Sequence, residues 1–330
     1  MMNILDFSAR VIPNLKLTPV QVVILKAIYG IPLDDTEFDI TIYMRSSWVK
    51  QRFTQRQYVQ WLYLTFRANV DLSAQEPKEY KESFLAIGRR SGKSLMSALI
   101  ALYDAYVLLQ IGDPHAYYNI SPSNPINITM FGTCKEQASL LLSEVNGLLA
   151  ATLPLVDNFP VTATRSFIKF GEFSEKGKVC IHTKSSAARS IRGMGMITVI
   201  MDEIAHYSDN GVPSGGEVYT AALPAVAGYA PWDHKKKKTT GPSDGKIVAM
   251  SSPLFGSYFH ERFESMREDK HSLFMQIPTW EMMPDITPSE LSEYRSKYGE
   301  KVFLVEFGAE FLDTRPKPKS PCPLCGHKPD

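Results

Sequence analysis

Short apolar runs alternate with longer amphipathic runs along the chain from residue 84 onward. The short runs are rich in β-branched and aromatic residues, which predicts buried strands, whereas the longer runs have helical periodicity. We predict strands at 84–87, 127–131, 166–170, 178–183, 196–201, 247–250 and 272–277, and helices at 93–110, 135–150, 256–267 and 287–298. This alternation indicates an α/β fold with a mostly parallel sheet flanked by helices.

The first 75 residues carry mainly helical signals. Thr18 followed by Pro19 is typical of a helix N-terminus, and a second helix is predicted from Thr54 to Asn69. The acidic segment 32–47 predicts a surface excursion. We therefore divide the chain into an N-terminal helical subdomain (1–75), a core (76–313) and a Pro- and Lys-rich tail (314–330). Within the core, 208–217 and 228–245 are predicted loops.

Composition adds few constraints. The chain has 330 residues, of which 44% are hydrophobic, so it can bury one large core or two modest ones. Its net charge is +1, so nucleic-acid binding would require a local basic patch. Lys235 to Lys238 form such a run, and both a solvated loop and a DNA-phosphate contact stay open.

No membrane span is predicted, because Asp104 and Gln110 interrupt the longest apolar stretch, and we expect an intracellular protein. Four cysteines do not make a disulfide framework. Cys134 and Cys180 are isolated in apolar contexts and are predicted to be reduced core residues.

A turn of small residues lies between the strand at 84–87 and the helix at 93–110. Free N–H groups and the dipole at a helix N-terminus favour phosphate. We predict that Lys93 reaches the β- and γ-phosphates of ATP and that Ser94 holds Mg²⁺. The usual pattern has four residues between its glycines, whereas three separate Gly88 from Gly92 here. The predicted phosphate loop comprises Gly88, Arg89, Arg90, Ser91, Gly92, Lys93 and Ser94.

Two adjacent carboxylates, Asp202 and Glu203, end a second buried strand. Asp202 would meet the water shell of Mg²⁺, and Glu203 would activate a water molecule for in-line attack on the γ-phosphate. This pair indicates hydrolysis of a nucleoside triphosphate. The alternative is a strand that ends in solvated acids, and the presence of Lys93 and Ser94 upstream favours the catalytic interpretation.

A third strand runs into Ser251, Ser252 and Pro253. Because ligands of open α/β sheets bind at strand carboxyl ends, these serines are candidates to sense the γ-phosphate or its attacking water. Alone, the motif is merely a turn. Gln21 is either a solvated residue or an amide that reads the adenine edge. His206 either orients Glu203 or satisfies a local hydrogen bond.

Four arginines are candidates to neutralise charge in the transition state. Arg192 precedes a glycine-rich turn and is the candidate to act on a neighbouring subunit, whereas Arg89 is the candidate within the same chain. For Arg90 and Arg189 we prefer a surface or ion-pair role. In the tail, Cys322, Cys325 and His327 resemble half of a zinc knuckle, one ligand short of the four that a closed site needs.

Five segments together resemble the large terminase subunit of tailed bacteriophages: 17–21, 88–94, 190–193, 199–206 and 251–253. The segments 278–281 and 306–311 are also similar to this family, so the resemblance covers about residues 15–313. A phosphate loop with an arginine after its first glycine, as in Gly88 and Arg89, is itself typical of terminases.

The resemblance implies a P-loop NTPase of the RecA-like (ASCE) type, with the N-terminal helices as a lid on the adenine side. It implies an ATP-driven motor that docks as a ring of five subunits on the portal protein of a procapsid. The motor would package viral double-stranded DNA in the host cell cytoplasm, with the small terminase subunit as a further partner.

The resemblance also implies residue roles. Gln21 would contact adenine, Asp202 would hold Mg²⁺, and Glu203 would be the catalytic base. Ser251, Ser252 and Pro253 would couple hydrolysis to subdomain motion. Endonuclease activity is not expected, because too few residues follow Glu310 and Asp313 for the nuclease domain of the family. The alternatives are a nucleic-acid remodelling ATPase or helicase, and a nucleotide-gated scaffold that recruits a separate nuclease.

Overall fold

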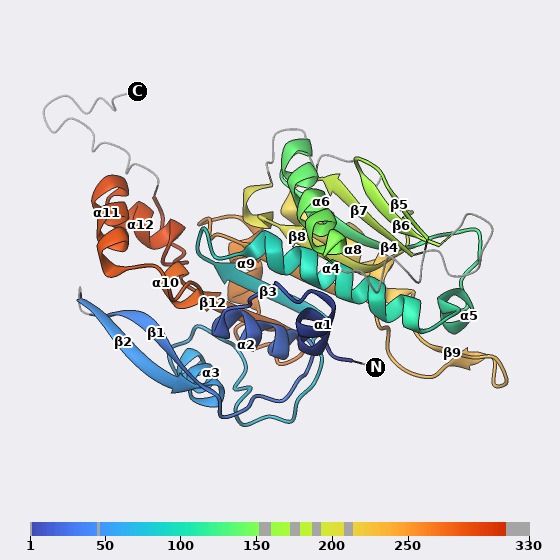
Figure 1. Cartoon of the computed structure of the whole chain (residues 1–330), viewed down its shortest axis with the longest axis horizontal. Helices are drawn as coiled ribbons and strands as arrows, with labels where there is room; N and C mark the ends of the chain where they lie inside the picture. Colours follow the sequence, from blue (N-terminus) through green and yellow to red (C-terminus); the bar gives the residue numbers. More distant parts are fainter. Residues whose placement is uncertain are drawn as a thin grey trace, which may run out of the picture.

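An eight-stranded sheet forms the centre of the computed structural model, which describes residues 2–44, 47–151, 160–171, 179–186, 193–207 and 214–314. The strand order is β12-β3-β11-β8-β4-β7-β6-β5 (Figure 1). Strands β12 to β7 of this order are parallel, and β6 and β5 are antiparallel. This confirms the predicted α/β fold with a mostly parallel sheet. The strands are β3 Glu82–Ile87, β4 Ile126–Gly132, β5 Val161–Ala163, β6 Phe167–Phe170, β7 Val179–Ser185, β8 Met196–Asp202, β11 Lys246–Ser251 and β12 Leu273–Ile277.

Helices cover both faces of the sheet, which explains the continuous apolar runs of its strands. Along β11, Val248 and Met250 share a core with α4 (Lys93–Gln110) and α6 (Lys135–Ala150). Ile247 and Ala249 share a second core with α8 (Gly215–Ala227) and α9 (Tyr258–Ser265). The predicted helices at 93–110 and 135–150 are therefore confirmed.

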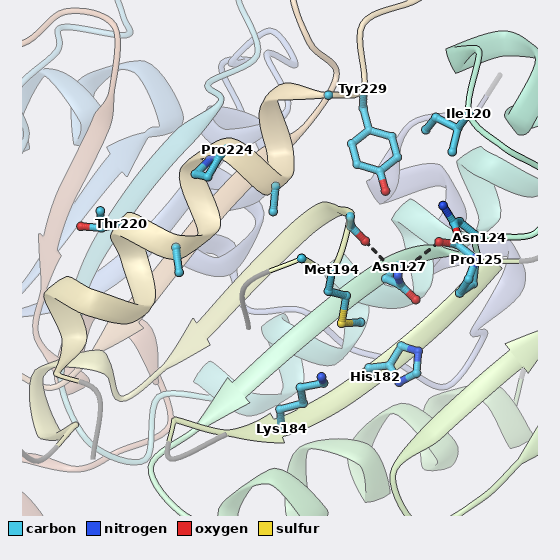
Figure 2. A pocket seen from close by; sticks show the side chains of 15 residues that line it. Ile120, Asn124, Pro125, Asn127, His182, Lys184, Met194, Thr220, Pro224 and Tyr229 are labelled. Carbon is cyan, nitrogen blue, oxygen red and sulfur yellow. Dashed lines mark hydrogen bonds between the residues drawn. The ribbon is translucent and has the colours of Figure 1, made fainter. Parts of the chain in front are cut away.

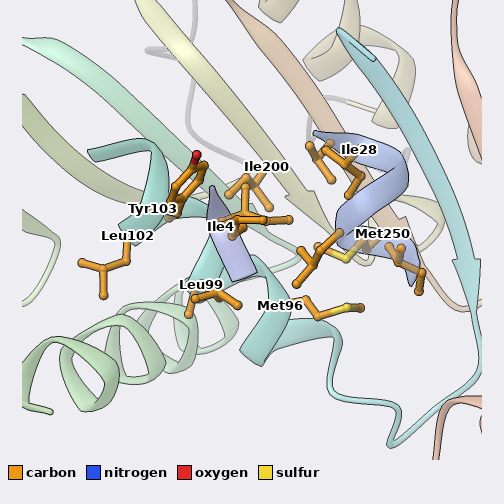
Figure 3. Close-up of a cluster of buried hydrophobic side chains, with 14 of the residues drawn as sticks. Ile4, Ile28, Met96, Leu99, Leu102, Tyr103, Ile200 and Met250 are labelled. Atoms are coloured by element: carbon orange, nitrogen blue, oxygen red, sulfur yellow. The ribbon is translucent and has the colours of Figure 1, made fainter. Parts of the chain in front are cut away.

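The N-terminal segment shares the first of these cores. Side chains of α1 (Ile4–Val11) and α2 (Pro19–Ile28) meet those of α4, β8 and β11 in one cluster (Figure 3). Thr18 caps α2 as predicted. Because this core is continuous, the sequence-based division at residue 75 stays a prediction.

The prediction of a surface excursion at 32–47 is wrong for the second half of this segment. Residues Glu37–Met44 form β1, which pairs antiparallel with β2 (Ser47–Thr54). The apolar side chains of Phe38, Ile40 and Ile42 are buried at every second position, a strand pattern hidden among acidic residues. The next helix, α3 (Gln55–Leu64), is shorter than predicted and is followed by Phe66 in a left-handed conformation, with φ of 59°.

Smaller elements complete the chain, and several were not predicted. The first residues of α8 fall within the expected loop at 208–217, and a short hairpin lies in the expected loop at 228–245. Helix α11 begins after Thr287 with the predicted capping box. These elements are α5 Pro114–Tyr118, η2 Ile204–His206, β9 Trp232–Asp233, β10 Lys238–Thr239, α10 Thr279–Met282, α11 Pro288–Tyr298 and α12 Glu300–Glu306.

The two described cysteines differ in environment. Cys180 is buried in β7, as predicted. The prediction that Cys134 is a core residue is wrong: it is exposed and is the N-cap residue of α6. None of the described helices is both long enough and apolar enough to span a membrane.

A buried charge network explains why Asp104 interrupts the apolar helix α4. Its carboxylate accepts hydrogen bonds from Tyr29 (2.9 Å) and Thr198 (2.6 Å), and it pairs with Lys246 Nζ at 3.3 Å. Lys246 also pairs with Glu79 at 2.7 Å. The network joins α4 to β8, to β11 and to the segment before β3.

We expect Lys246→Met to lower the free energy of unfolding by about 3–5 kcal/mol, because it leaves a buried carboxylate without its partner. Urea unfolding measures the change. Lys270→Met, at an exposed position, is the control and should shift the free energy by less than about 0.5 kcal/mol. Equal losses in the two variants would contradict the assigned role.

Candidate nucleotide site

The phosphate loop, residues 88–94, joins the carboxyl end of β3 to the start of α4. Gly92 has a φ of +74° and is the N-cap residue of α4. A Cβ atom on Gly88 would lie 2.3 Å from the hydroxyl of Thr279 and 2.5 Å from the carbonyl oxygen of Phe307. The close approach of Thr279 and Phe307 therefore requires glycine at position 88, and the left-handed backbone conformation favours glycine at position 92.

Segments near the C-terminal end of the described chain hold the loop in place. Gly88 N–H donates to the Ile277 carbonyl (3.1 Å), and Arg89 N–H donates to the Glu306 carbonyl (2.7 Å). The Thr279 hydroxyl donates to the Arg89 carbonyl (2.7 Å). The Arg89 guanidinium also forms an ion pair with the Glu306 carboxylate. Strand β12 and helices α10 and α12 thus fix the backbone around Arg89.

Helix α2 supports the loop from another side. The side chain of Gln21 is buried; its Oε1 accepts from Thr18 N–H at 2.9 Å, and its Nε2 donates to the Ser91 carbonyl at 3.3 Å. Both the oxygen and the nitrogen of this amide therefore form hydrogen bonds with backbone groups of the chain. The contact of Gln21 with adenine stays a prediction. Arg90 donates to the hydroxyl of Tyr294 at 2.8 Å.

Strand β11 lies between β3 and β8 and brings the phosphate loop to the paired carboxylates. Lys93 is buried, and its Nζ donates to the carbonyls of Ile87 (3.3 Å) and Gly88 (3.2 Å). The same Nζ lies 3.2 Å from Glu203 Oε1. Two sequence motifs more than a hundred positions apart thus meet in one site.

Glu203 is held by the Ser251-Ser252 motif. Its Oε2 accepts from Ser251 Oγ (3.1 Å), Ser252 N–H (2.9 Å) and Ser252 Oγ (3.0 Å). His206 Nε2 lies 3.0 Å from Ser252 Oγ, so it supports the serine that holds the carboxylate. Burial raises the pKa of Glu203, but Lys93 and the Ser252 N–H outweigh it, so the pKa lies below its ordinary value. The carboxylate is therefore ionised at neutral pH.

Asp202 has the opposite electrostatic environment. It is 1% exposed, and burial together with the charge of Glu203 raises its pKa to about 6. Its Oδ2 accepts from Gln137 Nε2 at 2.9 Å, while its buried Oδ1 has no hydrogen-bond partner among the described residues. A buried carboxylate oxygen without a partner is the kind of donor that Mg²⁺ prefers. Gln137, which donates to the other oxygen of Asp202, lines the same cleft as Ser94. The residues present therefore fit a magnesium ion.

Sequence reasoning missed Gln137. It lies in the first turn of α6, directly after β4, and β4 pairs with β8. Its position beside Asp202 depends on the pairing of β4 with β8, which the sequence does not show. The one sequence feature that could have indicated Gln137 is its place as a polar residue just after a predicted strand.

A cleft of about 590 Å³ is lined by the phosphate loop and by Gln137, Glu203, His206 and Ser252. Its lining residues are Arg89, Arg90, Ser91, Gly92, Lys93, Ser94, Leu95, Thr133, Gln137, Glu144, Glu203, His206 and Ser252. It contains most of the predicted phosphate loop, the predicted base and one of the two predicted serines.

A larger cavity of about 960 Å³ lies elsewhere, near the amino ends of β4 and β8. There Asn127 donates to the carbonyls of Pro125 and Gly195, below the ring of Tyr229 (Figure 2). Nucleotides bind open α/β sheets at the carboxyl ends of strands, and this cavity has no phosphate loop. Position and chemistry therefore favour the smaller cleft as the nucleotide site.

Several predicted residues lie outside the described part of the chain: Arg189, Arg192, Cys322, Cys325 and His327. Within the described ranges, no group of three or more His, Cys, Asp or Glu residues is arranged to hold a metal ion. The zinc candidates and the choice between the arginines stay predictions.

The parallel sheet, the phosphate loop at a helix N-terminus and the adjacent carboxylate strand define a P-loop NTPase fold of the RecA-like type. The chain belongs to the family described as "Uncharacterized protein MJ0330, N-terminal P-loop domain", which matches residues 2–301. No curated protein matches the sequence significantly.

Two solved structures show the same fold. The large terminase ATPase domain of Thermus phage P74-26 is 16% identical, with a TM-score of 0.53 over 72% of this chain and 91% of that chain. The large terminase of bacteriophage HK97 is 12% identical, with a TM-score of 0.53 over 93% of this chain and 54% of that chain. The predicted resemblance to terminase ATPase domains is thus confirmed at the level of the fold.

We expect Asp202→Asn to stabilise the metal-free protein at pH 7.5. The pKa of Asp202 rises from 3.8 to about 6 on folding, so the folded state binds the proton more tightly than the unfolded state. The ionised carboxylate therefore costs up to about 3 kcal/mol above pH 6, and this cost disappears as the pH falls towards 4. Urea unfolding in EDTA between pH 4 and 8 measures it, and a less stable variant at pH 7.5 would contradict this account.

Proposed function

We propose that the chain hydrolyses ATP and uses the energy to move double-stranded viral DNA into a procapsid. The observation that carries the proposal is the contact between the phosphate-loop Lys93 and Glu203, whose carboxylate Ser251 and Ser252 also hold. This contact supports a role for Glu203 as the general base, because its carboxylate lies beside the ammonium group that would bind the γ-phosphate. The fold shared with terminase ATPase domains supports the choice of motor.

We assign roles in ATP hydrolysis to the residues that line the cleft and to Asp202. Lys93 exchanges its contacts with carbonyl oxygens and Glu203 for the β- and γ-phosphates of ATP. Glu203 then accepts a proton from the attacking water. Mg²⁺, held by Ser94 and Asp202, would neutralise phosphate charge. Ser252, supported by His206, keeps the base aligned, and Pro253 follows it at the end of β11.

A packaging motor needs a procapsid and DNA as partners. The named neighbours are large terminases, so we propose that this chain acts in the host cell cytoplasm as a ring, of five subunits, on the portal of a procapsid. Viral double-stranded DNA and a small terminase subunit would be its other partners. We assign no endonuclease activity to this chain.

The test is the ATPase rate of the wild-type chain with and without double-stranded DNA and procapsids. We expect stimulation by both, and we expect Glu203→Gln to bind a fluorescent ATP analogue normally but to lose turnover by a factor of at least about 100. Normal turnover by Glu203→Gln would refute the assigned base. DNA strand separation without packaging would favour a helicase, and absence of DNA stimulation would favour a scaffold.

We also expect Arg192→Ala to lose ATPase activity by a factor of about 10³ or more, because an arginine finger stabilises charge only in the transition state. If Arg192 acts on the neighbouring subunit, mixing this variant with Glu203→Gln should restore part of the activity. Arg189→Ala, three positions away, is the matched control and should stay active. If the mixture stays inactive, Arg89 becomes the candidate, and its release from Glu306 becomes a requirement for catalysis.

A further inference from the structure

The β9–β10 hairpin is a structured projection in the loop region 228–245. Figure 1 shows it extending away from the body of the chain beside α5. Its strands pair Asp233 with Lys238 and Trp232 with Thr239. The turn between them contains Lys235, Lys236 and Lys237.

Hydrogen bonds order the turn of this hairpin and attach the hairpin to α5. The Asp233 carboxylate accepts from the backbone N–H groups of Lys235 (2.9 Å) and Lys236 (3.0 Å), which closes the turn. His234 Nε2 lies 2.7 Å from the carbonyl oxygen of Ala116 in α5. The lysines are therefore presented by an ordered turn and not by an unstructured loop.

The ammonium groups at the tip are poorly neutralised. All four lysines are exposed, and the only ion pair that involves them among the described residues joins Lys236 to Asp233 at 3.8 Å. Asp113 and Asp244 form hydrogen bonds with the neutral Ala116 N–H and Tyr118 hydroxyl, and neither forms an ion pair with these lysines among the described residues. A chain of net charge +1 thus concentrates positive charge at one projecting tip.

We propose that Lys235 to Lys238 contact the phosphate backbone of double-stranded DNA. The proposal rests on the proposed function, because it names the surface with which the motor holds its substrate. Four consecutive exposed residues of the hairpin are lysines, whereas the hot spots of protein–protein interfaces are enriched in Trp, Tyr and Arg. Lysines that act as point charges bind phosphates regardless of sequence, which suits a motor that must move every sequence.

The hairpin is well separated from the nucleotide site. The phosphate loop lies at the N-terminal end of α4, and α5, to which the hairpin is bonded, follows its C-terminal end. Eighteen residues of α-helix span about 27 Å. Changes at the hairpin can therefore be tested separately from nucleotide binding.

The test variant replaces the four charges while keeping the turn: Lys235→Gln, Lys236→Gln, Lys237→Asn and Lys238→Thr. Asparagine is chosen at position 237 because this residue has a φ of 51°, which Asn tolerates. One control changes all four lysines to Arg. A second control changes the exposed Lys16, Lys270, Lys297 and Lys301 to Gln and removes the same total charge.

Fluorescence anisotropy with a labelled DNA duplex measures affinity between 50 and 200 mM KCl, in the presence of a non-hydrolysable ATP analogue. We expect the slope of log K against log salt to weaken by about 0.9 for each lysine that contacts a phosphate, so by up to about 3.6 in the test variant. Both controls should keep the wild-type slope, and melting temperatures should show that all variants fold.

Three outcomes would overturn the inference. If the test variant has the wild-type slope while wild-type ATPase is stimulated by DNA, the motor holds DNA elsewhere and only the hairpin assignment fails. If the second control loses as much slope as the test variant, net charge and not the hairpin governs binding. If the wild-type chain neither binds the duplex nor responds to it, the proposed function fails and the hairpin assignment falls with it.

Discussion

The parallel pairing of β11 with both β3 and β8 is the constraint on which the site depends. It places the carboxyl ends of three strands side by side, so that Lys93, Glu203 and Ser252 converge although they are distant in sequence. The contact of 3.2 Å between Lys93 and Glu203 is the direct result. Since both strand neighbours of β11 are buried on two faces, this arrangement is held by the two hydrophobic cores and not by the site itself.

The phosphate loop is supported by distant parts of the chain. Thr279, Glu306 and Phe307 contact it from one side, and Gln21 contacts it from α2. A loop whose backbone groups bind phosphate must have a fixed shape before the nucleotide arrives, and these contacts supply it. They also link the nucleotide site physically to α10 and α12.

Buried charge serves two purposes in this fold. Asp104 is surrounded by partners and joins α4 to the sheet, so the loss of one partner would leave a buried charge uncompensated. Among the described residues, one oxygen of Asp202 has no hydrogen-bond partner, and its pKa is about 6, so its burial costs stability in the absence of metal. The second pattern is typical of a functional site, because such sites bury ionisable groups whose pKa values are strongly shifted.

The α/β class, the phosphate loop and the paired carboxylates could be predicted from the amino-acid sequence, because each depends on local periodicity or on adjacent residues. It did not show β1, whose alternating apolar residues lie among acids, or the exposure of Cys134 at a helix start. The folded structure was needed to show that Gln137 donates to Asp202, that Gln21 donates to the Ser91 carbonyl, and that Ser251 and Ser252 hold Glu203. These contacts depend on strand order and on helix packing, which act between residues far apart in the chain and leave no local pattern to read.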